Sequence, residues 1–249
     1  MSVSVSRDGH VAIVEIDRPP NNHVSVDLMA ELAGVFDTLD ADVECRAIVL
    51  CSAGKNFCAG ADLVNRPGNP SLSTSDLYVQ AVRLFDNKKP IVAAVQGAAV
   101  GAGLGLAIVA DFRIAGADAR FTANFTKLGF HPGFGLTHTL PRLIGGQRAA
   151  LMFMTGRRIK ADEALVWGLV DEVADDPRAA AMRLAQEIAE NAPLAVQSTR
   201  ATLRGDLSAA VKSQTDHEHK EQTWLRQTED YAEGVRAVNE RRPGNFVGR

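Results

Sequence analysis

Two runs of small residues constrain the fold of this chain more than any other feature. They are residues 57–63 (FCAGADL) and residues 97–105 (GAAVGAGLG). Each run stands where a strand is expected to pass into a helix. Backbone of this kind can present bare N–H groups to a ligand, because few side-chain atoms stand in the way. Two such N–H groups that converge on one carbonyl oxygen form an oxyanion hole.

Length and composition predict an ordinary globular chain. It has 249 residues, of which 46% are hydrophobic and 23% charged, enough for one large domain or a domain with a helical extension. The net charge is −3 and no basic block occurs, which argues against nucleic acid as a partner. Residues 91–110 carry four glycines and a glutamine, so we interpret them as a buried strand, loop and helix, and expect no membrane span.

The cysteines and the amino terminus favour a cytoplasmic protein. Cys45, Cys51 and Cys58 are an odd number, typical of buried free thiols in a reducing compartment. Residues 1–5 (MSVSV) have neither a basic region nor a long apolar core. We therefore expect no signal peptide.

Hydrophobic periodicity predicts a parallel sheet with crossover helices in the first half. Residues 3–6 and 11–17 flank Asp8-Gly9, a strong hairpin signal. Ser25 can cap a helix with an apolar stripe of helical period. Buried strands at residues 46–51 and 91–95 then enclose a helix at residues 75–86. The alternation of strands and helices is typical of a mixed α/β fold.

The second half is mostly helical in pattern. A short strand is predicted at residues 111–115, loops and turns at 121–135, and a turn at 156–159. Predicted helices follow at residues 161–167, 176–191, 194–204, 208–226 and 229–241.

The chain resembles the crotonase superfamily, the enoyl-CoA hydratase/isomerase group. The resemblance covers nearly the whole chain, and its strongest segments are residues 17–19, 57–63, 97–111, 129–137 and 155–173. It implies an α/β spiral of ββα units at residues 1–195 and a helical trimerisation region at residues 196–249. It also implies an acyl-CoA thioester as ligand, a homotrimer or a hexamer built from two trimers, and no metal or separate cofactor.

Carried over by position, the resemblance implies backbone oxyanion donors at Ala61 and Ala102. Ala102 would open a helix, whose positive N-terminal end suits a developing enolate oxygen. The implied substrate-binding positions are Asn22, Val24, Ala59, Asp62, Leu63, Gly101, Gly105, Asn124, Phe125 and Gly133. Two alternatives remain: both small-residue runs only permit close packing of a helix on a sheet, and Asp62 only caps a helix.

Gly105 and Phe125 stand where the hydratases of this family carry two carboxylates. Those carboxylates hold and deprotonate the water that adds to the enoyl double bond. Glycine and phenylalanine cannot exchange protons, and no Asp or Glu lies between Asp118 and Asp162. We therefore expect a lyase- or isomerase-class enzyme with an atypical site and weak or no ordinary hydratase activity.

Two other interpretations of the same scaffold stay open. In the first, a different acyl-CoA enzyme (a hydrolase, decarboxylase or isomerase) uses a non-standard base such as His131, because an imidazole titrates near neutral pH. Tyr78 is a weaker candidate of the same kind. In the second, the protein binds acyl-CoA without catalysis, as a carrier or as a subunit of a complex.

Overall fold

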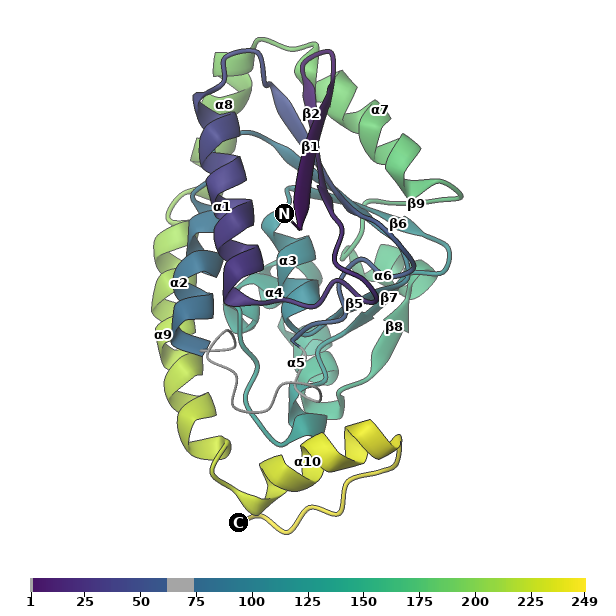
Figure 1. Cartoon of the computed structure of the whole chain (residues 1–249), viewed down its shortest axis with the longest axis vertical. Helices are drawn as coiled ribbons and strands as arrows, with labels where there is room; N and C mark the ends of the chain where they lie inside the picture. Colours follow the sequence, from purple (N-terminus) through teal and green to yellow (C-terminus); the bar gives the residue numbers. More distant parts are fainter. Residues whose placement is uncertain (1, 62–73) are drawn as a thin grey trace.

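The computed structural model describes residues 2–61 and 74–249, which form the mixed α/β fold predicted from the sequence (Figure 1). The described strands of the main sheet lie in the order β1-β2-β3-β4-β6-β9, and β1 alone runs antiparallel to its neighbour. Their bounds are Val3–Asp8, Val11–Ile16, Ala47–Ser52, Ile91–Val95, Phe112–Gly116 and Glu172–Ala174.

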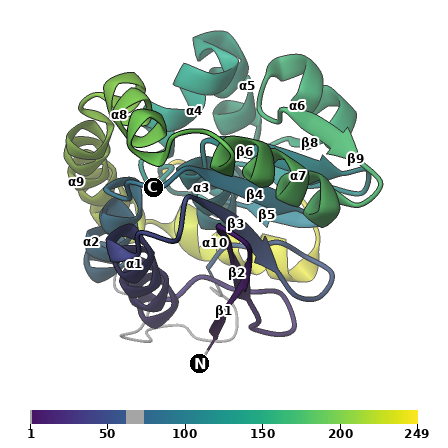
Figure 2. The same ribbon diagram turned by 90° about the horizontal axis from the view of Figure 1, so that it is seen from above.

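Helices cover both faces of this sheet (Figure 2). In β3, Val49 packs with the alanines of α7 on one face, and Leu50 belongs to the larger core on the other. This alternation follows from the period of two along a strand. The helices are α1 (Val26–Ala41), α2 (Thr74–Phe85), α3 (Ala102–Val109), α4 (Leu136–Ile144), α5 (Gly146–Thr155), α6 (Ala161–Trp167), α7 (Pro177–Ala189), α8 (Pro193–Arg204), α9 (Leu207–Leu225) and α10 (Glu229–Glu240).

Local sequence signals account for most of these elements. The hairpin of β1 and β2 turns at Gly9, whose φ of +56° favours glycine. The Ser25 hydroxyl accepts the N–H of Leu28 at 3.2 Å and caps α1 as predicted. Asp176 caps α7 in the same way, through the N–H groups of Arg178 and Ala179.

A second, small sheet was not predicted. It contains β5 (Ala98–Val100), β7 (Arg120–Thr122) and β8 (Arg158–Lys160), with β5 parallel and β8 antiparallel to β7. The predicted turn at residues 156–159 and the predicted loop from residue 121 were therefore wrong in part. Three-residue strands carry too few positions to show a period, and these form because each pairs with a distant segment.

Helix α8 is fastened to the sheet by one shared carboxylate. Asp111 accepts hydrogen bonds from Nε of Arg200 at 2.8 Å, Nε of Arg204 at 3.0 Å and the N–H of Ile91 at 2.8 Å. Arg200 is 8% exposed, so its charge depends on this partner. The Asp111 carboxylate therefore ties α8 to the start of β4.

The last two helices follow α8 and cover a further part of the core. Helix α9 lies along α2 and α4, and α10 crosses the lower end of the molecule in Figure 1, where it packs on the 3-10 helix η2 (Phe125–Leu128). The division of the chain at residue 195 stays a prediction. Within the described ranges no helix is both long and apolar enough to cross a membrane.

A buried glutamate on α9 caps α4 from a distance. The Glu218 side chain accepts the N–H of Gly135 at 2.7 Å and that of Thr137 at 3.0 Å, and also the Thr137 hydroxyl at 2.5 Å. These N–H groups belong to the first turn of α4, where helix geometry provides no partner. Burial raises the pKa of the Glu218 carboxyl to about 7, although the hydrogen bonds from Thr137 act in the other direction.

We expect Asp111→Ala to lower the free energy of unfolding by about 3–5 kcal/mol, because it leaves two arginines near the core without their carboxylate. Asp37→Ala is the matched control, since it removes only the surface pair with Arg83 and should cost about 1 kcal/mol or less. Urea unfolding measures both variants. Equal losses of unfolding free energy in the two variants would show that the Asp111 network stabilises the fold no more than a surface ion pair does.

The second prediction concerns pH. The pKa of Glu218 is raised from 4.5 to about 7 in the folded protein. Between these two pH values the folded state therefore keeps a proton that the unfolded chain has lost. The contribution of this carboxyl to the free energy of unfolding is therefore complete below its pKa in the unfolded chain, and it is lost as the pH rises to about 7. Relative to Glu218→Gln, the wild-type free energy of unfolding should fall by about 2–3 kcal/mol between about pH 5 and pH 8. Urea unfolding at both pH values checks this, and a constant difference would contradict it.

Candidate active site

The first small-residue run forms a bridge between two parts of the fold. The N–H of Cys58 donates to Ala98 of β5 at 2.9 Å, and the N–H of Ala59 donates to Asn21 at 3.0 Å. Because successive residues of an extended segment bond to opposite sides, residues 57–61 lie between the 21–24 segment and β5. The run is therefore held on both flanks by backbone hydrogen bonds.

Gly60 changes the direction of the next peptide group. Its φ is +84°, and its carbonyl accepts the N–H of Val24 at 2.9 Å. Across a trans peptide the C=O and the following N–H point in opposite directions. The N–H of Ala61 therefore points away from Val24, to the side on which β5 lies.

Two glycines bring this segment and the start of α3 into backbone contact. A Cβ on Gly60 would lie 2.7 Å from the carbonyl oxygen of Val100, and a Cβ on Gly103 would lie 2.1 Å from that of Cys58. Ala61 follows Gly60, and Ala102 precedes Gly103. The two alanines predicted as oxyanion donors are thus each one residue from a point of close approach.

The N-terminus of α3 has the properties of an acceptor site for negative charge. Ala102 is the first residue of the helix after Gly101, and N–H groups of a first helical turn have no partner inside the helix. Gly101, Gly103 and Gly60 are buried, whereas Ala102 and Ala61 are partly exposed. A ligand can therefore approach the two alanines from outside.

Phe134 occupies the space beside Gly105. A Cβ on Gly105 would lie 2.5 Å from Cδ1 of Phe134, so this position admits no side chain while the ring is there. Phe134 is 1% exposed and has a φ of +65°, an uncommon conformation for an aromatic residue. An apolar ring therefore stands one helical turn from Ala102, where the sequence comparison with hydratases placed a carboxylate.

Phe125 brings a second ring to the start of α3. It begins η2, and its Cζ would be 3.6 Å from a Cβ on Gly101. Its other side meets Phe130 edge to face at 5.6 Å between ring centroids, and Phe130 meets Tyr231 of α10 in the same way. Helix α10 thus supports the aromatic group that contacts Gly101.

His131 lies against α9. Its ring meets that of His217 edge to face at 5.9 Å, and its Nδ1 is 2.8 Å from the Pro132 carbonyl oxygen. A carbonyl only accepts, so Nδ1 carries the proton in this contact and leaves Nε2 as the acceptor of the neutral ring. A role of His131 as base stays a prediction.

Tyr78 reaches the same segment from α2. A Cβ on Gly133 would lie 1.8 Å from the Tyr78 hydroxyl and 2.6 Å from Nε2 of Gln222, so these groups meet at Gly133. Burial, and to a smaller extent the charge of Glu218, raises the pKa of Tyr78 well above its usual value. The hydroxyl therefore keeps its proton at neutral pH and acts as a donor.

The remaining predicted binding residues lie around this core. Asn22 is buried, donates to the carbonyls of Ala53 and Asn56 at 2.8 Å each and accepts the N–H of Arg18, so its side chain organises the loop. Val24 pairs with Ala61 in a parallel bridge, and Asn124 precedes η2. Asp62 and Leu63 lie outside the described residues.

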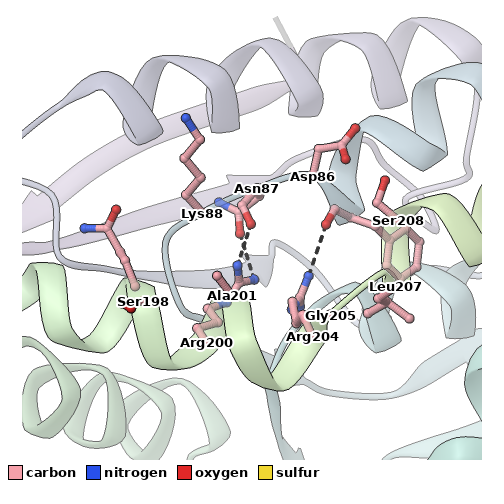
Figure 3. A pocket seen from close by; sticks show the side chains of 12 residues that line it. Asp86, Asn87, Lys88, Ser198, Arg200, Ala201, Arg204, Gly205, Leu207 and Ser208 are labelled. Carbon is pink, nitrogen blue, oxygen red and sulfur yellow. Dashed lines mark hydrogen bonds between the residues drawn. The ribbon is translucent and has the colours of Figure 1, made fainter.

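A separate cavity of about 440 Å³ lies between α8 and the loop after α2 (Figure 3). It contains none of the predicted site residues. All three nitrogens of the Arg200 guanidinium donate to Asp111 or Asn87, and those of Arg204 donate to Asp111, Phe85 and Val109. We interpret this cavity as part of the attachment of α8, because its two arginines already have protein partners.

Glu218 was missed as a contributor to the site. A signal existed for Glu218: Val211, Thr215, Glu218 and Gln222 recur at helical spacing, and all four are buried. Polar residues at core positions of an amphipathic helix indicate a specific partner. No group of three His, Cys, Asp or Glu that could hold a metal ion occurs in residues 2–61 and 74–249.

Comparisons with known proteins identify the family. The Enoyl-CoA hydratase/isomerase family model matches residues 6–249. A probable enoyl-CoA hydratase of Mycobacterium tuberculosis is 41% identical, over 87% of this chain and 86% of its own length. (E)-benzylidenesuccinyl-CoA hydratase of Thauera aromatica is 34% identical over the whole of both chains.

Solved structures give the same result. The crystal structure of an enoyl-CoA hydratase/isomerase from Pseudoalteromonas atlantica matches with a TM-score of 0.87 and 31% identity, over 99% of this chain and 100% of that one. The predicted crotonase fold is therefore confirmed. The chain belongs to the enoyl-CoA hydratase/isomerase family.

Proposed function

We propose that this protein binds an acyl-CoA thioester and stabilises its enolate between the N–H groups of Ala61 and Ala102, with weak or no ordinary hydratase activity. The single observation that carries the proposal is the double contact of Gly60 with Val100 and of Gly103 with Cys58. These contacts adjoin Ala61 and Ala102, the two partly exposed residues whose N–H groups the proposal uses. A preorganised donor of this kind is worth roughly 10²–10³-fold in rate.

The outcome of the reaction follows from what stands beside these donors. Hydration needs a group that deprotonates water and a group that returns a proton to the α-carbon. Beside α3 the described neighbours of Gly105 and Gly101 are the rings of Phe134 and Phe125, which transfer no protons. The proposal is thus an enolate site in an apolar setting, without a separate cofactor.

The proposal extends to assembly and compartment. We place the protein in the cytoplasm, in lipid or acid catabolism, as a homotrimer or a dimer of trimers. Three free, buried thiols suit a reducing compartment. Exposed Phe112 and Leu203 line a hollow beside α8, an apolar surface of the kind that subunits cover.

Ala102→Pro tests the oxyanion site directly. Proline lacks the N–H and fits the first position of a helix, so the change removes one donor and leaves α3 in place. Affinity for an acyl-CoA should fall by about tenfold, while affinity for free coenzyme A stays unchanged. Calorimetry measures both, with Ala102→Ser as the control that keeps the N–H. Equal wild-type affinity for free coenzyme A and the thioester would contradict the proposal.

Hydration is tested by the loss of the conjugated enoyl-CoA absorbance. We expect turnover at least about 10²-fold below that of a relative with both carboxylates, because general acid–base help is worth about 10²–10⁴-fold per group. Turnover equal to such a relative would contradict this expectation.

A panel of other thioesters separates the two remaining interpretations. Turnover that His131→Ala abolishes would favour a different reaction with His131 as base. Tight acyl-CoA binding without any product would favour a carrier or a subunit of a complex.

A further inference from the structure

Helix α9 contacts the segment at residues 131–137 through two buried side chains. Nε2 of Gln222 donates to the carbonyl of His131 at 2.8 Å and to that of Pro132 at 3.2 Å. Glu218 accepts the N–H groups of Gly135 at 2.7 Å and of Thr137 at 3.0 Å. The two contacts lie on either side of Phe134, so the segment is fixed before and after this residue.

Phe134 needs such support because its backbone is strained. Its φ of +65° costs an L-residue on the order of 1–3 kcal/mol and persists only where the surroundings enforce it. The next residue, Gly135, also has a positive φ, of +70°. Together the two residues turn the chain so that the Phe134 ring packs against Gly105 of α3.

Packing alone does not explain the buried polar face of α9, because the burial of polar side chains costs free energy. Glu218 is 0% and Gln222 is 1% exposed. Hydrophobic side chains at these positions would avoid the desolvation of a carboxyl and an amide, which costs several kcal/mol unless hydrogen bonds offset it. The contacts that offset it here are made to residues 131, 132, 135 and 137. The polar side chains therefore specify the path of this one segment.

We propose that Glu218 and Gln222 are positioning residues that hold the Phe134 ring against Gly105 and thereby set the shape of the acyl pocket beside Ala102. The part of this inference that concerns the pocket rests on the proposed function. The part that concerns positioning rests only on the contacts described above. In this proposal the two side chains act through residue 134 rather than by contact with the thioester.

The positioning half is tested without any ligand. Amide hydrogen exchange of Gly135 and Thr137 in the full-length protein should quicken at least about tenfold in Glu218→Ala, because their acceptor is removed. Glu218→Gln keeps one acceptor oxygen and should give a smaller effect. Glu221→Ala is the matched control: Glu221 is a partly exposed glutamate on the same helix that accepts a hydrogen bond from Nε1 of Trp224, and the change should leave both exchange rates unaltered. Unchanged exchange in Glu218→Ala would overturn the positioning role, and Gln222→Ala gives a second test if Glu218→Ala fails to fold.

The pocket half is tested by the ratio of affinities for octanoyl-CoA and free coenzyme A, measured by calorimetry. Gln222→Ala and Glu218→Gln should lower this ratio about threefold to tenfold and leave the affinity for free coenzyme A unchanged. In a Phe134→Ala background the same changes should have no further effect, because their route to the ligand is gone. Additive effects would overturn the inference.

A last control separates positioning from general loss of stability. Asp111→Asn loosens the attachment of α8 and contacts no residue of the 131–137 segment. It should leave the affinity ratio unchanged, and an equal fall in this variant would overturn the inference. A wild-type protein without preference for octanoyl-CoA would overturn the proposed function and the pocket half together, while the exchange experiment still decides the positioning half.

Discussion

The close contact of two backbone segments without intervening side chains is the constraint on which the rest of this structure depends. Gly103 places its Cα against the Cys58 carbonyl, and Gly60 does the same against Val100. A single methyl group at either position would separate the strand from the helix terminus, because backbone atoms cannot move aside as flexible side chains do. The main sheet, the small sheet and α3 all serve to hold these two segments at this distance.

Aromatic rings pack around this contact. Gly105 has no side chain, and the ring of Phe134 fills the volume that a side chain would need. Phe125 reaches Gly101 and rests on Phe130, which Tyr231 of α10 supports in turn. The two changes are therefore coupled physically: a carboxylate at position 105 requires another residue at 134. This packing of Phe134 on Gly105 is the physical basis of the apolar site proposed above.

The sequence predicted the elements whose signals are local. Ser25 and Asp176 cap helices because their side-chain oxygens accept N–H groups two or three residues away, and the continuous apolar run at residues 47–51 follows from burial on both faces of the strand. The two small-residue runs likewise predicted where backbone would approach backbone. The small sheet escaped prediction because β5, β7 and β8 are three residues each and are stabilised by partners 22 to 40 residues away.

The backbone of the candidate site carries local sequence signals, whereas the side chains that support it do not. Glycine has no Cβ, so it permits both a positive φ and close contact between two backbone segments. Residue type alone therefore indicates that Gly60 and Gly103 can have such a role. The left-handed conformation of Phe134 has no such signature, because it is imposed by Glu218 and Gln222 from more than eighty residues further along the chain. The backbone conformation of a strained residue that a remote helix holds in place follows only from the complete fold, and local sequence does not predict it. The shape of the acyl pocket therefore depends on the packing of α9 against α2 and α4, so a change at that interface can alter ligand preference without touching the ligand.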